Sequence, residues 1–325
     1  MTMKKQILNI RQTLQKSKHP IIFFDADCDG ATSYFQLKHT FPQSRGYSTC
    51  KDFKKQEQLS NYINEKTDLV LFIDTPAIGN ELLDKIKEKK TPIIWVDHHP
   101  TDNTEKIKCY NITYLNPTLQ YQTNLPGAYL AYLITDDNDN LSRAVLGSIA
   151  DFFLQDIIEE LYIQSPQKLR TLINIPDEKL EEIFSYIKNN IENHTIAPQD
   201  KRDDYIRYLT YETNINTLRN FIESVLKYEE DQERVSAIRE IEKLEPSELI
   251  SNINAQKGFL YEEFLRREKS IRRVLEKALK TPHDENLFFF EYRGRRGNCG
   301  ALSQEINYKA KSKVTCICIK KRGKD

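Results

Sequence analysis

The chain has 325 residues, enough for two domains of ordinary size, and its 39% apolar and 30% charged residues are typical of a globular protein. No stretch approaches the roughly 20 apolar residues of a membrane helix, and the first 20 residues lack the apolar centre of a secretory signal. Lys plus Arg and Asp plus Glu both number 48, and this neutral balance taken alone argues against a strongly basic nucleic-acid binder.

The cysteines and the distribution of charge refine this first view. The six cysteines show no CxxC or disulfide-framework spacing, which indicates reduced thiols and a cytoplasmic protein without a membrane anchor. Residues 265–325 carry 17 Lys and Arg against seven Asp and Glu, in the runs "RREKSIRR", "RGRRGN" and "KKRGK". Each run alone reads as a solvated surface, but three in one segment favour a surface that contacts a polyanion.

The first 150 residues alternate apolar runs with amphipathic helical patterns. The predicted strands are 20–24, 68–73, 91–96 and, more weakly, 111–115. This alternation predicts βαβ units, and therefore an α/β fold with a parallel sheet covered by helices on both faces. Right-handed crossovers place the carboxyl ends of all strands at one edge, where functional residues collect.

The rest of the chain changes character. Residues 126–280 are helical and polar, and "TPHDEN" at 281–286 breaks the pattern with turn-forming residues. Two further strands, "LFFFEYR" and "KVTCICIKK", then flank the helical "NCGALSQEINYKAK". We therefore predict an α/β domain over 1–200, a helical connector over 201–284 and a small, partial α/β domain over 285–325.

Three aspartates, Asp25, Asp27 and Asp29, follow the first strand in "DADCDG". At alternate positions of an extended segment their side chains point the same way and repel unless a cation neutralises them. A turn rich in Asp and Gly is one alternative. An EF-hand loop is another, but the glutamate required at its twelfth position is replaced by Gln36.

Potential ligands also follow the next strands. Asp74 ends "LFID", and Asp97, His98 and His99 end "WVDHH", while Trp95 beside them is expected in the core. Asp151 closes "AVLGSIAD", where apolar surroundings disfavour a bare carboxylate and Gly147 allows close helix packing.

Several carboxylates and two imidazoles at one edge suit Mn²⁺ or Mg²⁺, and the lack of cysteine ligands disfavours structural zinc. Two such ions activate water and stabilise phosphoryl charge, so the pattern predicts phosphoester hydrolysis by two ions. Metal binding without catalysis is the alternative.

The motifs "DADCDG", "LFIDTPA", "VDHHP" and "LGSIAD", in this order, resemble the four motifs of the DHH phosphoesterase superfamily. An aspartate that opens the first motif is similar to the RecJ-type single-strand exonucleases, as are "YLNPTL" and "LPGAYLAYLI" between the third and fourth motifs. The resemblance covers about residues 18–155.

The resemblance implies a division of labour among these residues. The implied ligands of one metal ion are Asp25, Asp27 and Asp74, and those of the second are Asp29, Asp74, His98 and Asp151, with Asp74 bridging. His99 is then expected to face the scissile phosphate, and Asp97 to orient the histidines.

The carboxyl-terminal part matches the family less well. "FEYRGRRGNCGALSQEI" resembles the start of the DHH-associated domain, but the glycine-rich GGGH-type motif of that domain is missing. From its basic loop we predict phosphate contacts by Arg293, Arg295, Arg296 and Asn298.

The resemblance implies a metal-dependent exonuclease acting on single-stranded DNA or RNA. A phosphodiesterase for short oligoribonucleotides or cyclic dinucleotides is the second reading, which Asp25 disfavours because those relatives usually have histidine there. A third is a replisome scaffold that binds the GINS complex, as some DHH relatives do.

Overall fold

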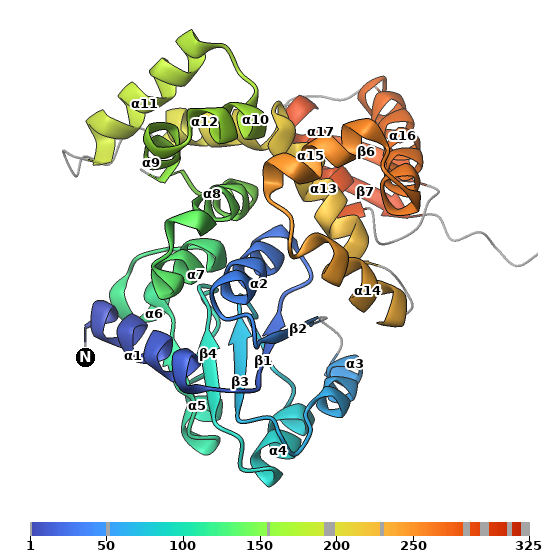
Figure 1. The fold of residues 1–325 in the computed structure, drawn as a ribbon. Coiled ribbons are helices and arrows are strands. Elements are labelled where there is room, and N and C mark those ends of the chain that lie inside the picture. Colours follow the sequence, from blue (N-terminus) through green and yellow to red (C-terminus); the bar gives the residue numbers. More distant parts are fainter. Residues whose placement is uncertain are drawn as a thin grey trace, which may run out of the picture. The chain divides into compact units, whose positions relative to one another are not determined.

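The structure is a computed structural model that describes residues 2–49, 53–154, 157–191, 199–227, 231–281, 287–292, 299–310 and 314–319. The contacts within the chain divide it into two compact units, Met1–Ile250 and Ser251–Asp325 (Figure 1). The division into three parts at residues 200 and 284 remains a prediction.

The first unit is built on a five-stranded sheet in the order β2-β1-β3-β4-β5. Its strands are β1 (Pro20–Phe24), β2 (Arg45–Ser48), β3 (Leu69–Ile73), β4 (Ile93–Val96) and β5 (Thr113–Leu115). All four pairings are parallel, which confirms the predicted α/β fold and the four predicted strands. Strand β2 was not predicted, because "RGYS" is short and lacks an apolar pattern.

Helices cover both faces of this sheet. The helices that precede residue 136 are α1 (Met3–Lys16), α2 (Cys28–Thr40), α3 (Phe53–Gln58), η1 (Leu59–Tyr62), α4 (Asn80–Glu88), α5 (Thr104–Cys109), α6 (Pro117–Tyr121) and α7 (Gly127–Thr135). On one face Phe23, Phe72 and Trp95 share a core with apolar residues of η1 and α4. On the other, Phe24 stacks on Tyr34 of α2 with ring centroids 4.8 Å apart. Burial of both faces explains why β1 and β3 are apolar throughout.

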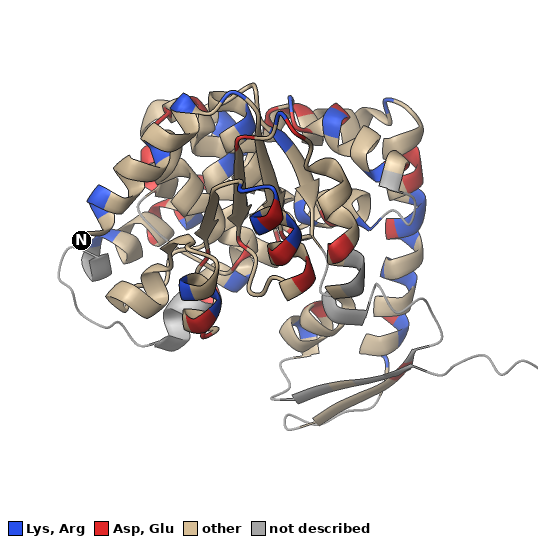
Figure 2. Ribbon diagram, turned by 90° about the horizontal axis from the view of Figure 1, so that it is seen from below, with Lys and Arg blue, Asp and Glu red and all other residues tan. Residues whose placement is uncertain are grey.

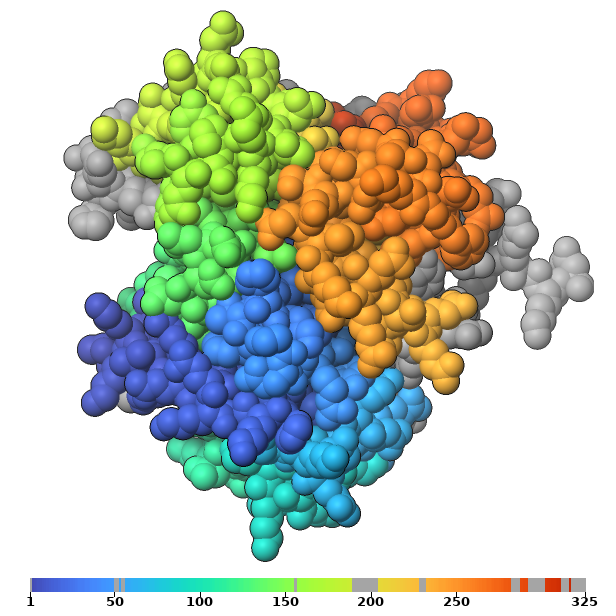
Figure 3. Space-filling view, in the orientation of Figure 1, coloured from blue at the N-terminus to red at the C-terminus, as the bar shows by residue number. Residues whose placement is uncertain are grey.

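Helix α1 lies on the surface of the first unit (dark blue in Figure 3). Its buried residues Ile7, Ile10 and Leu14 recur every three or four positions, so one side faces α7 and β5 while lysines occupy the other.

The remaining helices complete the first unit. They are η2 (Asn138–Asn140), α8 (Leu141–Ala150), α9 (Ile157–Gln164), α10 (Pro166–Ile173), α11 (Asp177–Ile191), α12 (Gln199–Tyr211), α13 (Asn214–Leu226), α14 (Asp231–Ile241) and α15 (Pro246–Ala255), which ends in the second unit. Helix α2 packs against α7, α8 and α13. A Cβ atom on Gly147 of α8 would lie 2.1 Å from Oγ1 of Thr32 and 2.5 Å from Cβ of Ala128, so glycine permits this close packing.

The second unit contains α16 (Phe259–Leu279), β6 (Leu287–Tyr292), α17 (Cys299–Ala310) and β7 (Val314–Ile319). Strands β6 and β7 pair in parallel, as expected for a small βαβ element. Its core consists of Leu275, Ala278, Phe288, Leu302 and Ile306. Among the helices of the described ranges, none has the length and apolar character needed to cross a bilayer.

Candidate metal centre

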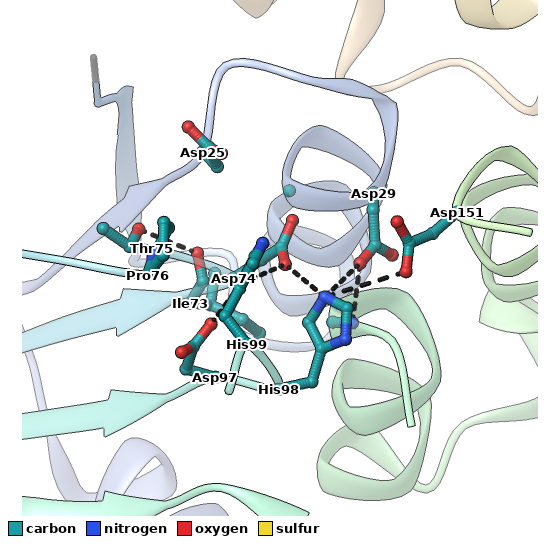
Figure 4. A network of polar contacts seen from close by, with 12 residues as sticks. Asp25, Asp29, Ile73, Asp74, Thr75, Pro76, Asp97, His98, His99 and Asp151 are labelled. Carbon is teal, nitrogen blue, oxygen red and sulfur yellow. Dashed lines mark hydrogen bonds and ion pairs between the residues drawn. The ribbon is translucent and has the colours of Figure 1, made fainter. Parts of the chain in front are cut away.

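Predicted ligands from separate segments meet at the carboxyl edge of the sheet (Figure 4). Because β1, β3 and β4 are neighbours and parallel, the residues that follow them emerge side by side. Nε2 of His98 lies 3.1 Å from Oδ1 of Asp74, 3.8 Å from Oδ2 of Asp29 and 3.7 Å from Oδ2 of Asp151. Two sets of three ligand atoms lie within 4.8 Å of one another, Asp29–His98–Asp151 and Asp74–His98–His99.

The His98 ring is oriented for metal ligation by its other nitrogen. Nδ1 lies 3.2 Å from the Oδ1 atom of Asn124, which can only accept a hydrogen bond. When Nδ1 donates to this oxygen, Nε2 is the nitrogen left to ligate a metal ion, and it lies on the side of the carboxylates. Metal-binding histidines are commonly held in this way.

Asp74 provides the test of whether a cation fits this place. Its side chain is 1% exposed, and within the described residues neither carboxylate oxygen has a hydrogen-bond partner, although Nε2 of His98 lies 3.1 Å from Oδ1. Burial raises the pKa of Asp74 well above its usual value, and the charges of Asp29, Asp27 and Asp25 raise it further. Buried anionic oxygens without donors are what a divalent cation would satisfy, so the donor set fits Mn²⁺ or Mg²⁺. The backbone of Asp74 is left-handed, with φ 56°, which turns the chain sharply where β3 ends.

Asp29 is fixed from the start of another helix. Its two oxygens accept hydrogen bonds of 2.7 Å from the backbone N–H groups of Gly127 and Ala128, the first residues of α7. Burial raises the pKa of Asp29 well above its usual value, with contributions from Asp151 and Asp27, although these hydrogen bonds oppose the rise. A Cβ atom on Gly127 would lie 2.7 Å from Cβ of Asp74, so only glycine lets α7 approach the centre this closely.

Asp25, Asp27 and Asp29 do not share one extended segment, contrary to the expectation from the sequence. The strand ends at Phe24, and Asp27 is the N-cap of α2, where its side chain accepts a 2.9 Å hydrogen bond from the Gly30 N–H. Asp25 therefore follows the end of the strand, Asp27 caps α2, and Asp29 lies in the first turn of that helix. Asp25 Oδ1 accepts a 2.8 Å bond from the Ala26 N–H. Within the described ranges, neither Asp25 nor Asp27 joins a set of three close ligand atoms, and their assignment to a metal ion remains a prediction.

Asp97 holds His99 rather than contributing to either ligand set. Asp97 is fully buried, and its Oδ1 lies 2.8 Å from Nδ1 of His99. Burial alone lowers the pKa of His99, but the hydrogen bond and the charge of Asp97, together with Asp25, outweigh it and raise the pKa. Asn116 fixes the backbone through a 2.9 Å bond from Nδ2 to the carbonyl of His99.

Asp151 follows α8 and is partly exposed, with 37% of its side chain accessible. The next residue, Phe152, has a left-handed backbone with φ 58°, which is unusual for a bulky side chain. The guanidinium of Arg219 lies 5.6 Å from the centre of the Phe152 ring, and the Tyr211 ring lies 5.9 Å away on α12. These contacts fix the segment that carries Asp151.

Arg219 is itself held by Glu223, one turn further along α13. Nε of Arg219 lies 3.0 Å from Oε1 of Glu223, and Nζ of Lys227 lies 3.0 Å from Oε2 of the same carboxylate.

Several residues around the metal centre were not predicted from the sequence. Four predicted phosphate contacts lie in a segment that the structure does not describe. Asn116, Asn124, Gly127 and Arg219 were missed, because each acts through a contact that depends on the fold, although Asn116 and Gly127 lie in the RecJ-like segments "YLNPTL" and "LPGAYLAYLI". Arg293, Arg295, Arg296 and Asn298 lie outside the described residues.

A parallel sheet with an acidic and imidazole centre at its carboxyl edge defines an α/β domain suited to binding divalent cations. Residues 20–153 match the DHH family, N-terminal domain. The chain thus contains a segment that matches the DHH-family N-terminal domain, and its fold is similar to that of RecJ.

Solved structures share this fold at low sequence identity. RecJ in complex with Mn²⁺ from Thermus thermophilus is 16% identical with a TM-score of 0.56, and the match covers 98% of this chain but only 46% of that one. The exonuclease RecJ bound to manganese is 14% identical with a TM-score of 0.53, covering 98% of this chain and 80% of that one. CDC45 from Entamoeba histolytica is 11% identical with a TM-score of 0.55, covering 97% and 84%. Curated protein sequences gave no match.

Proposed function

We propose that this protein is a metal-dependent phosphodiesterase that degrades single-stranded DNA or RNA from an end, as a RecJ-like exonuclease. The observation that carries the proposal is the approach of His98 Nε2 to the carboxylates of Asp29, Asp74 and Asp151, while Nδ1 of the same ring lies 3.2 Å from Oδ1 of Asn124. RecJ structures with manganese share the fold, which supports Mn²⁺ or Mg²⁺ as the ion.

Two ions are proposed, with Asp74 shared between them. His98, Asp29 and Asp151 complete the ligands of one ion, and Asp25 and Asp27 those of the other. When bound, such a pair supplies an activated water and charge neutralisation at the phosphoryl group. The buried, donor-free oxygens of Asp74 suit the shared position.

His99 is the proposed contact to the scissile phosphate. Asp97 holds its Nδ1, and this leaves Nε2 as the atom that can donate a hydrogen bond to a phosphoryl or leaving oxygen. Asp97 is buried, so packing around its carboxylate fixes the pair. Within the described residues, its second oxygen has no hydrogen-bond partner.

The test is digestion of 20-nucleotide single strands of DNA and RNA, labelled at either end, with Mn²⁺ or Mg²⁺. We expect metal-dependent products that grow shorter from one end, and none from the Asp74→Asn or His98→Ala variants. Asp204→Asn, a change on the exposed part of α12, serves as the matched control and should keep full activity. Absence of hydrolysis of both nucleic acids by the parent protein would overturn the proposal. Dinucleotides cleaved faster than the 20-mers would favour the phosphodiesterase for short substrates.

A scaffold role in replication is the second candidate, because the likeness to CDC45 extends over 84% of that chain. Under this reading Asp74→Asn leaves the binding of a replication partner such as GINS unchanged.

We also expect a cytoplasmic protein, since Cys28, Cys109 and Cys316 are free thiols.

A further inference from the structure

One side of α16, in the second unit, carries a row of cations. We define the basic face as Arg266, Lys269, Arg273, Lys277 and Lys280, the last of which follows the final residue of the helix. All five residues are exposed. They are spaced three or four residues apart, and at 3.6 residues per turn they fall within an arc of about 80°. Figure 2 shows blue segments recurring along this helix.

The opposite side of α16 is fixed against the core of the second unit. Leu275 and Ala278 pack in the cluster that contains Phe288, and Phe264 is buried as well. The helix therefore cannot rotate its basic face inward without losing this core.

Two of the four glutamates of α16 pair with arginines. Glu262 falls within the arc of the basic face and Glu276 lies beside it, but within the described ranges neither forms an ion pair with it closer than 4.0 Å. Glu263 pairs mainly with Arg267 and only at 3.6 Å with Arg266, and Glu268 pairs with Arg272 at 3.2 Å. Within the described ranges, Lys269, Arg273, Lys277 and Lys280 take part in no ion pair closer than 4.0 Å.

This arrangement is unfavourable for an ordinary solvated helix. Exposed helices usually place opposite charges four residues apart, whereas Lys269, Arg273 and Lys277 place like charges there. Each such pair destabilises a helix through repulsion between the like charges. A row that carries this penalty is suited to a ligand that brings negative charge.

An aromatic side chain extends the row at its amino-terminal end. Phe259 is 74% exposed and lies seven residues, or two turns, before Arg266, on the same side of the helix. Polyphosphate has no group that would use this ring. A single-stranded nucleic acid does, since its bases stack on exposed aromatic rings while its phosphates meet cations.

We infer that the basic face of α16, together with Phe259, binds single-stranded nucleic acid independently of its sequence. The inference rests on the proposed function for the identity of the ligand. The face spans about 21 Å at 1.5 Å per residue, so that it meets several consecutive phosphates. Binding through such a row releases counterions and falls steeply with salt.

The test measures the fluorescence anisotropy of labelled single-stranded (dT)20 and (rU)20 with the full chain in EDTA, so that no strand is cleaved. The variant combines Lys269→Ala, Arg273→Ala and Lys277→Ala. We expect its Kd to rise at least tenfold at low salt, and the slope of log K against log salt to become shallower by about 2, since each cation contributes roughly 0.7.

A matched control removes three exposed cations elsewhere. Lys4→Ala, Lys5→Ala and Lys16→Ala on α1 change the net charge equally, and this variant should change Kd less than twofold. Phe259→Ala should weaken binding about fivefold without changing the salt slope, because stacking releases no counterions. The unfolding temperature of the α16 variant should be no lower than that of the parent, since repulsion has been removed.

The outcomes separate this inference from the proposed function. If the parent hydrolyses a chromogenic phosphodiester with Mn²⁺ but both triple variants bind (dT)20 alike, the inference is wrong and the proposed function stands. If the parent fails to hydrolyse any substrate but loses (dT)20 binding only in the α16 variant, the proposed function is wrong and the inference stands. Binding of polyphosphate or phosphatidylserine vesicles through the basic face, without binding of (dT)20 or (rU)20, would also overturn it.

Discussion

Nδ1 of His98 lies 3.2 Å from Oδ1 of Asn124, a residue 26 positions further along the chain. This contact holds the direction of the imidazole ring. A residue outside every recognised motif thereby sets the geometry of the proposed metal ligand.

The first prediction is that Asn124→Ala weakens Mn²⁺ binding by about 10- to 100-fold, because the His98 ring loses the acceptor that orients it. Calorimetric titration of the metal-free protein measures this change. Asn124→Asp keeps an oxygen acceptor and should restore most of the affinity, while Asn80→Ala, at an exposed position of α4, should match the parent. Equal affinity in all variants would show that Asn124 does not orient the ligand.

The second prediction concerns stability in the absence of metal. Because the pKa of Asp74 is raised, the ionised carboxylate destabilises the folded protein at neutral pH. Asp74→Asn removes the buried negative charge while a polar group of the same size remains, so it should raise the free energy of unfolding in EDTA by about 1–3 kcal/mol.

Thermal unfolding with and without Mn²⁺ checks the second prediction. The parent should gain stability on addition of Mn²⁺ and the variant should not, since it has lost a ligand. A variant that is less stable than the parent in EDTA would contradict the description of Asp74 as unsatisfied.

The third prediction addresses the approach of α7 to the centre. Gly127→Ala places a Cβ atom 2.7 Å from Cβ of Asp74, so the helix must shift. We expect the free energy of unfolding to fall by about 1–3 kcal/mol and Mn²⁺ binding to weaken. Gly79→Ala, where the nearest atom is 3.5 Å away, is the matched control and should change stability by less than about 0.5 kcal/mol. Denaturant unfolding of both variants provides the comparison.

The fourth prediction is a pH dependence at the ion pair that holds Arg219. Burial raises the pKa of Glu223, but the charges and hydrogen bonds of Lys227 and Arg219 outweigh it and lower the pKa below its usual value. A lowered pKa means that Glu223 stabilises the fold above pH ~4.3, its unfolded value, and that this contribution disappears as the pH falls through the folded pKa.

Glu223→Gln tests the fourth prediction. At pH 7 we expect a loss of roughly 2–3 kcal/mol, less than for a fully buried pair because Lys227 is partly exposed. Urea unfolding between pH 7 and 3 should show the parent and variant converging as the pH falls. A difference that stays constant over this range would rule out the ion pair as its source.

The alternation of the apolar runs of β1, β3, β4 and β5 with amphipathic helical patterns predicted a parallel sheet. A parallel sheet in turn requires Asp74, His98 and the start of α2 to emerge at one edge. Most of the candidate centre could therefore be predicted from the ends of three strands. Strand β2 could not, because four residues with little apolar character give no periodic signal.

The sequence by itself determined which residues follow each strand. It also determined that they meet at one edge, because strand direction and crossover hand place the carboxyl ends of the parallel strands together. Only the tertiary structure decided how these residues are held. Asn124, Gly127 and Arg219 reach the centre from helices and loops that are distant along the chain, through hydrogen bonds and close packing. Such contacts are made or lost when the distance between two segments changes by a few tenths of an ångström. The local pattern of a sequence does not specify distances between segments that are far apart along the chain.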